Sequence, residues 1–233
     1  MSLLGGKQPD IKQVGVVTRN PQFKKLLSSI LAEWKFFTVD DLAAARVVFA
    51  EHGLELPPRV GEVVWLTPMP PAEGSFLEPP ISLSRLYHLL EVQFFSTPRH
   101  HIRVAMDLAI DLNIDENWLK GRLLSLSGRG GRIACAHEIP RGRSLQLQLM
   151  LAGRVQRLAA EVIYSLPAGD GQGVSQPQVG VLFKPFVDQQ FEMLRHFIEK
   201  TCIERACARE GIALRDPCLS WLDVPVDPWS ATR

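Results

Sequence analysis

Residues 103–127 have the sequence RVAMDLAIDLNIDENWLKGRLLSLS, in which apolar and polar residues alternate over the first half. Every second residue from 104 to 112 is apolar, and this period of two is typical of a half-buried strand. Residues 119–127 predict a second strand, which ends at the glycine-rich segment 128–131. The stretch therefore predicts two successive strands with no helix between them.

Short strands continue after this stretch. Residues 145–151 show the same alternation, with leucine at every second position. Strands that follow one another through turns alone point to an antiparallel barrel or sandwich. Behind them, residues 187–202 place apolar side chains on one helical stripe, with Asp188 as N-cap. The remaining strands are predicted at residues 132–136, 154–166 and 178–184.

The first part of the chain combines short apolar runs with helical periodicity. Residues 14–17 and 63–66 are apolar runs typical of buried strands. Strands that alternate with helices favour a small α/β layer with a parallel sheet. Helices are predicted at residues 21–34, at residues 41–52 with Asp40 or Asp41 as cap, and at residues 82–94.

These patterns predict an α+β multidomain protein. We expect an α/β domain at residues 1–95, a β-domain at residues 96–200, and a helix extension and tail at residues 201–233. The β-domain begins where the period changes from helical to alternating, close to residue 96.

Composition limits the classes of partner. The chain has 46% apolar residues, 22% charged residues and a net charge of +1, as in an ordinary soluble globular protein. It has neither the roughly 18 uninterrupted apolar residues of a membrane helix nor an N-terminus that resembles a signal peptide. Four cysteines without C-x-x-C spacing indicate reduced thiols and no metal site. We therefore expect a cytoplasmic protein with no membrane insertion and no nucleic-acid polymer as partner.

Two arginines stand before the first strand of the β-domain, and a hydroxyl-rich glycine turn closes the second. The arginines are Arg99 and Arg103 of the segment RHHIR, and residues 125–130 have the sequence SLSGRG. The planar fork of arginine matches phosphate and can also engage guanine O6 and N7. Glycines let backbone N–H groups approach an anion closely. The pattern suits a ligand with phosphates and guanines, but solvated arginines beside an ordinary turn would give it too.

In order and spacing, these elements resemble the PilZ family of cyclic di-GMP receptors, whose motifs are R-x-x-x-R and then D/N-x-S-x-x-G. The resemblance covers roughly residues 96–200 and implies an antiparallel six-stranded PilZ-type β-barrel with a C-terminal helix. It also implies cyclic di-GMP as ligand, without a cofactor or metal. Arg99 and Arg103 would grip phosphate and guanine, Ser127 would hydrogen-bond a guanine edge, and a glycine would give the base room. The implied ligand-binding residues are Arg99, Arg103, Ser125, Ser127 and Gly130, with His100, Arg129 and Arg132 as peripheral contacts.

Ser125 departs from the family motif, in which an aspartate or asparagine bonds the guanine edge. Losing one charge-assisted hydrogen bond costs about 1.5–3 kcal/mol, roughly ten- to a hundredfold in affinity. We therefore expect weaker cyclic di-GMP binding, and the alternative is a PilZ-like protein-interaction adaptor that does not bind the nucleotide. No carboxylate is placed to form a base–nucleophile pair with Ser127 or Cys135, so no enzymatic activity is expected.

Residues 1–95 resemble a shortened, degenerate response-regulator receiver. Thr18-Arg19-Asn20 stands where receivers carry an acidic metal-binding pair, Thr67 aligns with the phospho-acceptor aspartate, and Pro79 replaces a lysine. We therefore expect an interaction platform for a protein partner, with a homodimer as a further option. Residues 94–98 link the two domains and run into the arginine motif. Ligand capture is thus expected to change the interdomain geometry or partner binding.

Overall fold

The computed structural model describes residues 12–169, 175–185 and 188–225. They form two compact units, one of residues up to His100 together with Cys202–Val224, and one of His101–Thr201 with Pro225. Helix α3 (Asp188–Glu210) contributes residues to both units. The segment predicted as a separate tail is therefore grouped largely with the first unit.

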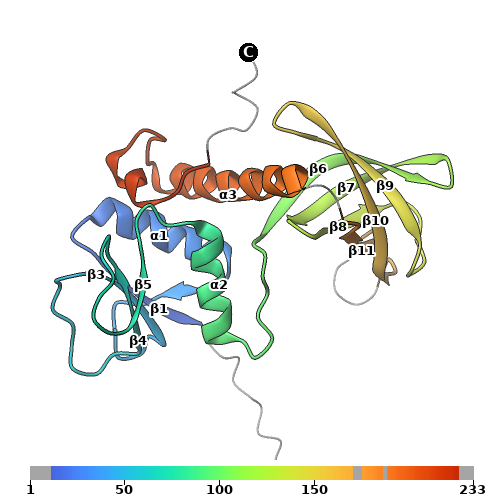
Figure 1. Cartoon of the computed structure of the whole chain (residues 1–233). Helices are drawn as coiled ribbons and strands as arrows, with labels where there is room; N and C mark the ends of the chain where they lie inside the picture. The colour runs from blue at the N-terminus through green and yellow to red at the C-terminus, as the bar shows by residue number, and fades with distance from the viewer. Residues whose placement is uncertain (1–11, 170–174, 186–187, 226–233) are drawn as a thin grey trace, which may run out of the picture. The chain divides into compact units, whose positions relative to one another are not determined.

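The first unit contains a five-stranded parallel sheet with the strand order β2-β1-β3-β4-β5 (Figure 1). This order is common among doubly wound α/β folds, so the receiver resemblance stays a prediction. The predicted α/β layer with a parallel sheet is confirmed. Its elements are β1 (Gln13–Val17), α1 (Pro21–Glu33), β2 (Phe37–Thr38), β3 (Val47–Glu51), β4 (Glu62–Leu66), β5 (Ser75–Leu77), α2 (Leu83–Phe94) and the short 3-10 helix η1 (Pro217–Trp221).

The helix predicted at residues 41–52 is wrong, because this segment contains the central strand β3. It pairs with β1 on one side and with β4 on the other. Its residues from Val47 to Ala50 are all fully buried, as expected for a parallel strand covered on both faces. Asp41 accepts the N–H of Ala43 at 3.1 Å within a turn, so this side chain stabilises a loop rather than a helix start.

Helix α1 begins as the sequence predicts. The Asn20 side chain accepts the N–H groups of Gln22 and Phe23 at 3.0 Å each, and Pro21 occupies the first turn. The C-terminal segment packs on this helix, since Trp221 stacks on Phe23 with 5.0 Å between ring centroids. Residues far apart in sequence therefore share the core of the first unit.

The second unit is a closed barrel with the strand order β10-β11-β8-β7-β6-β9, in which every neighbouring pair is antiparallel (Figure 1). Of the two predicted alternatives, a barrel and a sandwich, the barrel is therefore confirmed. Alternating side chains such as Val104, Leu112, Leu126 and Leu147 fill its interior and are almost fully buried. The strands are β6 (Arg103–Ile114), β7 (Asn117–Ser127), β8 (Gly130–Cys135), β9 (Ser144–Leu151), β10 (Arg154–Leu166) and β11 (Gln178–Phe183).

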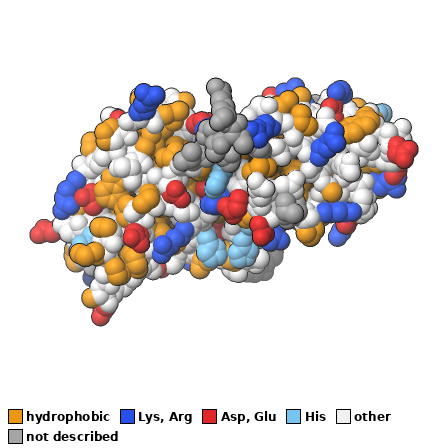
Figure 2. All heavy atoms as spheres, turned by 45° about the horizontal axis from the view of Figure 1, so that its top comes forward, with side chains coloured by type: hydrophobic (Ala, Val, Ile, Leu, Met, Phe, Trp, Pro, Cys, Tyr) orange, Lys and Arg blue, Asp and Glu red, His pale blue; other side chains and the backbone are white. Residues whose placement is uncertain are grey.

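The face drawn in Figure 2 carries charges of both signs. On the face drawn in Figure 2, acidic and basic side chains are interspersed, consistent with the net charge of +1. In the described part of the chain, no helix is long and apolar enough to cross a membrane. The same residues contain no group of three or more metal-ligating side chains placed to hold an ion.

Candidate functional site

Strand register places three of the predicted site residues in one row across the barrel. Arg103 at the start of β6 lies opposite Ser127 at the end of β7, and Ser127 lies opposite Gly130 at the start of β8. Directly opposed residues in antiparallel strands have Cβ positions about 4.5–5.5 Å apart. The first residue of β6 is therefore a neighbour of the turn that joins β7 to β8.

A second row lies beside the first. Ser125 is opposite Ala105 on β6 and Arg132 on β8. Because residues two apart on a strand share a face, both rows lie on the same face. Arg103 and Arg132 are exposed there, whereas the intervening Leu126 is fully buried, so this is the outer face of the barrel. Five predicted residues thus share one patch, the outer patch: Arg103, Ser125, Ser127, Gly130 and Arg132.

The two serines of the outer patch are largely covered by their neighbours. Ser125 is 7% exposed and Ser127 is 6% exposed. The Ser127 hydroxyl donates to the carbonyl oxygen of Gly130 at 3.0 Å, which closes the turn. The Ser127 hydroxyl proton is therefore already engaged in this hydrogen bond. The same oxygen still has lone pairs, with which it can accept a hydrogen bond from a donor such as a guanine N–H.

Gly130 belongs to strand β8 rather than to a loop, in contrast to the predicted strand start at residue 132. A Cβ added at Gly130 would lie 2.2 Å from the carbonyl oxygen of Val181 on β11. Such a contact is with backbone and cannot be relieved by turning a side chain. The closure of the barrel at β8 and β11 therefore requires glycine at this position.

We expect Gly130→Ala to lower the free energy of unfolding by about 1–3 kcal/mol, because β8 and β11 must separate to admit the methyl group. Urea unfolding followed by circular dichroism measures the change. Gly128→Ala is the matched control, since its added Cβ would meet only side-chain atoms, the nearest on Phe191 at 3.1 Å. Equal stability of Gly130→Ala and wild type would contradict the steric argument.

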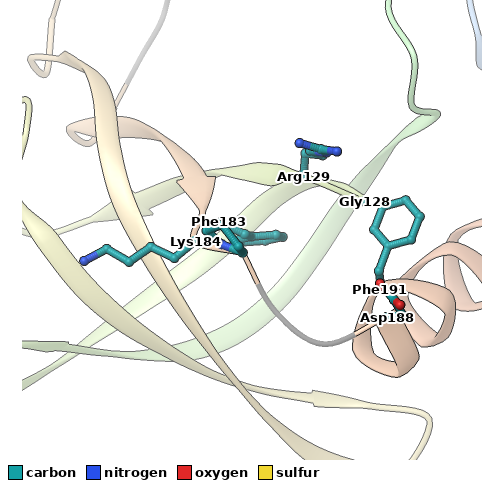
Figure 3. Close-up of a pocket in the computed structure, with 7 residues that line it drawn as sticks. Gly128, Arg129, Phe183, Lys184, Asp188 and Phe191 are labelled. Carbon is teal, nitrogen blue, oxygen red and sulfur yellow. The ribbon is translucent and has the colours of Figure 1, made fainter.

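A cavity of about 360 Å³ opens at the end of the barrel beside this turn. Figure 3 shows the Phe191 ring pointing from α3 toward Gly128, and the Lys184 side chain extending away from them. The Lys184 ammonium donates to Ser144 at 3.0 Å, so Arg129 is the cation more available to the cavity. The lining residues are Gly128, Arg129, Phe183, Lys184, Pro185, Asp188 and Phe191.

Aromatic residues of this cavity are absent from the predicted site. Phe191 meets His101 edge-to-face, with 5.5 Å between ring centroids. Phe191 belongs to the apolar stripe of the predicted helix, and nothing in its spacing distinguishes a residue at a cavity from one in the core. Aromatic faces of this kind can stack on nucleobases. The predicted peripheral residue Arg129 lies at the same cavity.

The first arginine of the motif, Arg99, belongs to the first unit together with His100. Its backbone N–H donates to the Glu91 carboxylate of α2 at 2.8 Å, and its guanidinium charge acts on the nearby Tyr87 hydroxyl by lowering the pKa of that group. His100 stacks on His88, with 5.5 Å between ring centroids. Arg99 and Arg103 are separated along the chain by four residues, which span at most about 14 Å.

Tyr87 is held in its neutral form. Its hydroxyl group is buried beside the Glu91 carboxylate, and both burial and that negative charge raise the pKa of Tyr87 above its usual value. The Arg99 guanidinium acts in the opposite direction and lowers the pKa, but with a smaller effect. Neither Tyr87 nor Glu91 is distinguished in the sequence, because both lie within an ordinary helical pattern.

Comparison with protein families found a match that covers this barrel. Residues 97–200 match the PilZ domain family. The matched segment contains both motifs, all six barrel strands and the first part of α3. The PilZ resemblance predicted for residues 96–200 is therefore confirmed, and so is the six-stranded barrel.

Solved structures with low sequence identity are also similar. The PilZ domain of YcgR from Escherichia coli, solved with c-di-GMP, is 17% identical over 50% of this chain and 100% of that chain, with a TM-score of 0.39. The Bacillus subtilis inhibitor of motility MotI/DgrA is 15% identical over 48% of this chain and 53% of that chain, also with a TM-score of 0.39. A tetrameric PilZ protein from Xanthomonas campestris is 24% identical over 40% of this chain and 50% of that chain, with a TM-score of 0.27. Comparison with curated proteins gave no match.

Proposed function

We propose that this chain is a non-enzymatic receptor for cyclic di-GMP, bound by Arg99, Arg103 and the outer patch. The observation that carries the proposal is the row in which Arg103, Ser127 and Gly130 stand side by side on three strands. The match of residues 97–200 to the PilZ family supports it. Bacterial second-messenger signalling is the process that such a receptor would serve.

The phosphates and the guanine bases of cyclic di-GMP can each be matched to groups of the proposed site. The Arg103 guanidinium can hold a phosphate with two parallel N–H donors, and Arg132 adds positive charge to the same face. The Ser127 oxygen can accept an N–H of the guanine edge. Phe191 and Arg129 offer a stacking face and a further cation at the adjoining cavity. These functions are binding functions, and none of them requires a chemical step.

Ligand capture would act on the segment that joins the two units. This segment contains Arg99 in the first unit and Arg103 in the second, so a ligand held by both arginines restricts the chain between them. The result is a change in interdomain geometry or in partner binding. We propose that the first unit is the surface for a protein partner or a second copy of the chain.

Calorimetric titration of the full chain with cyclic di-GMP tests the receptor function. We expect heat release with a dissociation constant in the micromolar range, because Ser125 replaces the acidic or amide residue of the family motif. The same titration with GMP is the control and should give at least tenfold weaker binding, since GMP cannot engage both arginines at once. The stoichiometry follows from the same curve. Absence of heat with cyclic di-GMP at tens of micromolar would refute the receptor function.

An adaptor that works through protein contacts alone is the second candidate. Two observations favour it: Ser125 is uncharged, and the Ser127 hydroxyl proton is already bonded to Gly130. Such an adaptor would retain the same protein partner with or without the nucleotide, whereas a receptor would bind it differently. Pull-down of one partner under both conditions separates the two functions.

A further inference from the structure

Glu91 is a buried carboxylate near the C-terminus of a helix, where the helix dipole disfavours a negative charge. It lies in the last turn of α2 and is only 4% exposed. A carboxylate near a helix C-terminus is disfavoured by the helix dipole, and burial adds a desolvation cost. Charges in such places are kept only where specific donors hold them. The donors at Glu91 therefore show what this side chain does.

One of these donors belongs to the arginine motif. The Arg99 N–H donates to Glu91 Oε2 at 2.8 Å. The buried Tyr87 hydroxyl lies close enough to Glu91 and Arg99 for both charges to act on its pKa, which Glu91 raises and Arg99 lowers. Glu91 thus holds the backbone of Arg99, and Tyr87 lies near both charged groups.

A further cation lies near Glu91 and Arg99. The Lys12 ammonium is 4.4 Å from the ring centroid of Phe95, the residue that follows α2, and 5.0 Å from that of Phe36. Burial lowers the pKa of Lys12, the Glu91 charge raises it, and the Arg99 charge lowers it. The charges of Lys12, Glu91 and Arg99 therefore influence one another at the point where α2 ends and the arginine motif begins.

We propose that Glu91 and Tyr87 are positioning residues for Arg99, which set the first arginine of the motif before the ligand arrives. The inference rests on the proposed function, since it assigns how Arg99 is prepared for cyclic di-GMP. Glu91 fixes the backbone of Arg99, and Tyr87 restricts its guanidinium. A side chain that is already restricted loses less conformational freedom on binding, which raises affinity. The same contacts connect the bound ligand to α2 and hence to the first unit.

Amide hydrogen exchange tests the backbone contact without any ligand. The Arg99 amide is expected to exchange at least tenfold faster in Glu91→Ala than in wild type, while Tyr87→Phe leaves it within threefold. Glu91→Gln keeps an oxygen acceptor and should restore most of the protection. Glu55→Ala, at an exposed glutamate of the same unit, is the control. Free exchange of the Arg99 amide in wild type would overturn the inference, whatever the ligand does.

Titration with cyclic di-GMP then tests the functional role. We expect about tenfold weaker binding by Glu91→Ala, two- to fivefold weaker binding by Tyr87→Phe, and wild-type binding by Glu55→Ala. In an Arg99→Ala background, Glu91→Ala should change the affinity less than threefold, because its effect passes through the missing side chain. An equal loss in both backgrounds would indicate a general folding defect and would overturn the inference.

If wild type itself does not bind, the receptor function fails and this role fails with it. If wild type binds and Glu91→Ala binds equally well, only the positioning role fails.

Discussion

Arg103→Ala is expected to weaken cyclic di-GMP binding by at least a hundredfold. Arg103 stands directly opposite Ser127 on the outer face of the barrel, where its guanidinium can form two parallel bonds to one phosphate. Each charge-assisted hydrogen bond contributes about 1.5–3 kcal/mol, and every 1.4 kcal/mol corresponds to a factor of ten. The loss of two such bonds therefore removes the measurable affinity of a micromolar ligand.

The measurement is calorimetric titration of the purified variant, with thermal unfolding to show that the barrel remains folded. Arg103→Lys retains the charge but loses the planar fork, and we expect an intermediate loss of about tenfold for it. Arg141→Ala is the matched control, because Arg141 is an exposed arginine of the same unit at a cavity lined by Ile114 and Asn117, at the other end of β6. If Arg103→Ala binds cyclic di-GMP with wild-type affinity, the ligand binds at a site that does not include Arg103.

The barrel strands could be predicted because their two faces differ chemically. Along β6 the buried side chains, those of Val104, Ile110 and Leu112, all belong to the apolar series with a period of two, so this period marks both the strand and its inner face. The same argument fails for β3, which is buried on both faces and has no polar period to mark it. Three alanines before it then continue a helical spacing that the tertiary structure overrides.

The site could be predicted in part for a related reason. Arg103, Ser127 and Gly130 lie within short motifs, and hairpin pairing of consecutive strands brings them together. Phe191 and Lys184 reach the adjoining cavity from segments distant in sequence, and Glu91 reaches Arg99 from helix α2 of the same unit. Such contacts depend on packing between elements, which periodicity does not encode.

Ser125→Asp is the second change with a large expected effect, and it acts in the opposite direction. Ser125 shares the outer face with Ser127 and lies opposite Arg132, so a carboxylate here would stand in the same patch beside a cation. It could accept the N–H groups of a guanine edge through a charged oxygen, which the serine hydroxyl does not provide. We expect the affinity for cyclic di-GMP to rise ten- to a hundredfold, as one charge-assisted bond contributes about 1.5–3 kcal/mol. Ser125→Asn should give a smaller rise.

Ala105→Asp is the control that separates recognition from charge. Ala105 lies directly opposite Ser125 in the same row and is exposed, so the added carboxylate would stand in the same patch but outside the covered position of Ser125. Away from the guanine edge it can only repel the phosphates, and we expect binding to weaken. Opposite responses of the two variants would mean that position 125 contacts the base itself. If Ser125→Asp binds no more tightly than wild type, the outer patch does not hold guanine in the way proposed. The adaptor function, in which the barrel presents a protein-binding surface, would then account better for the serine at this position.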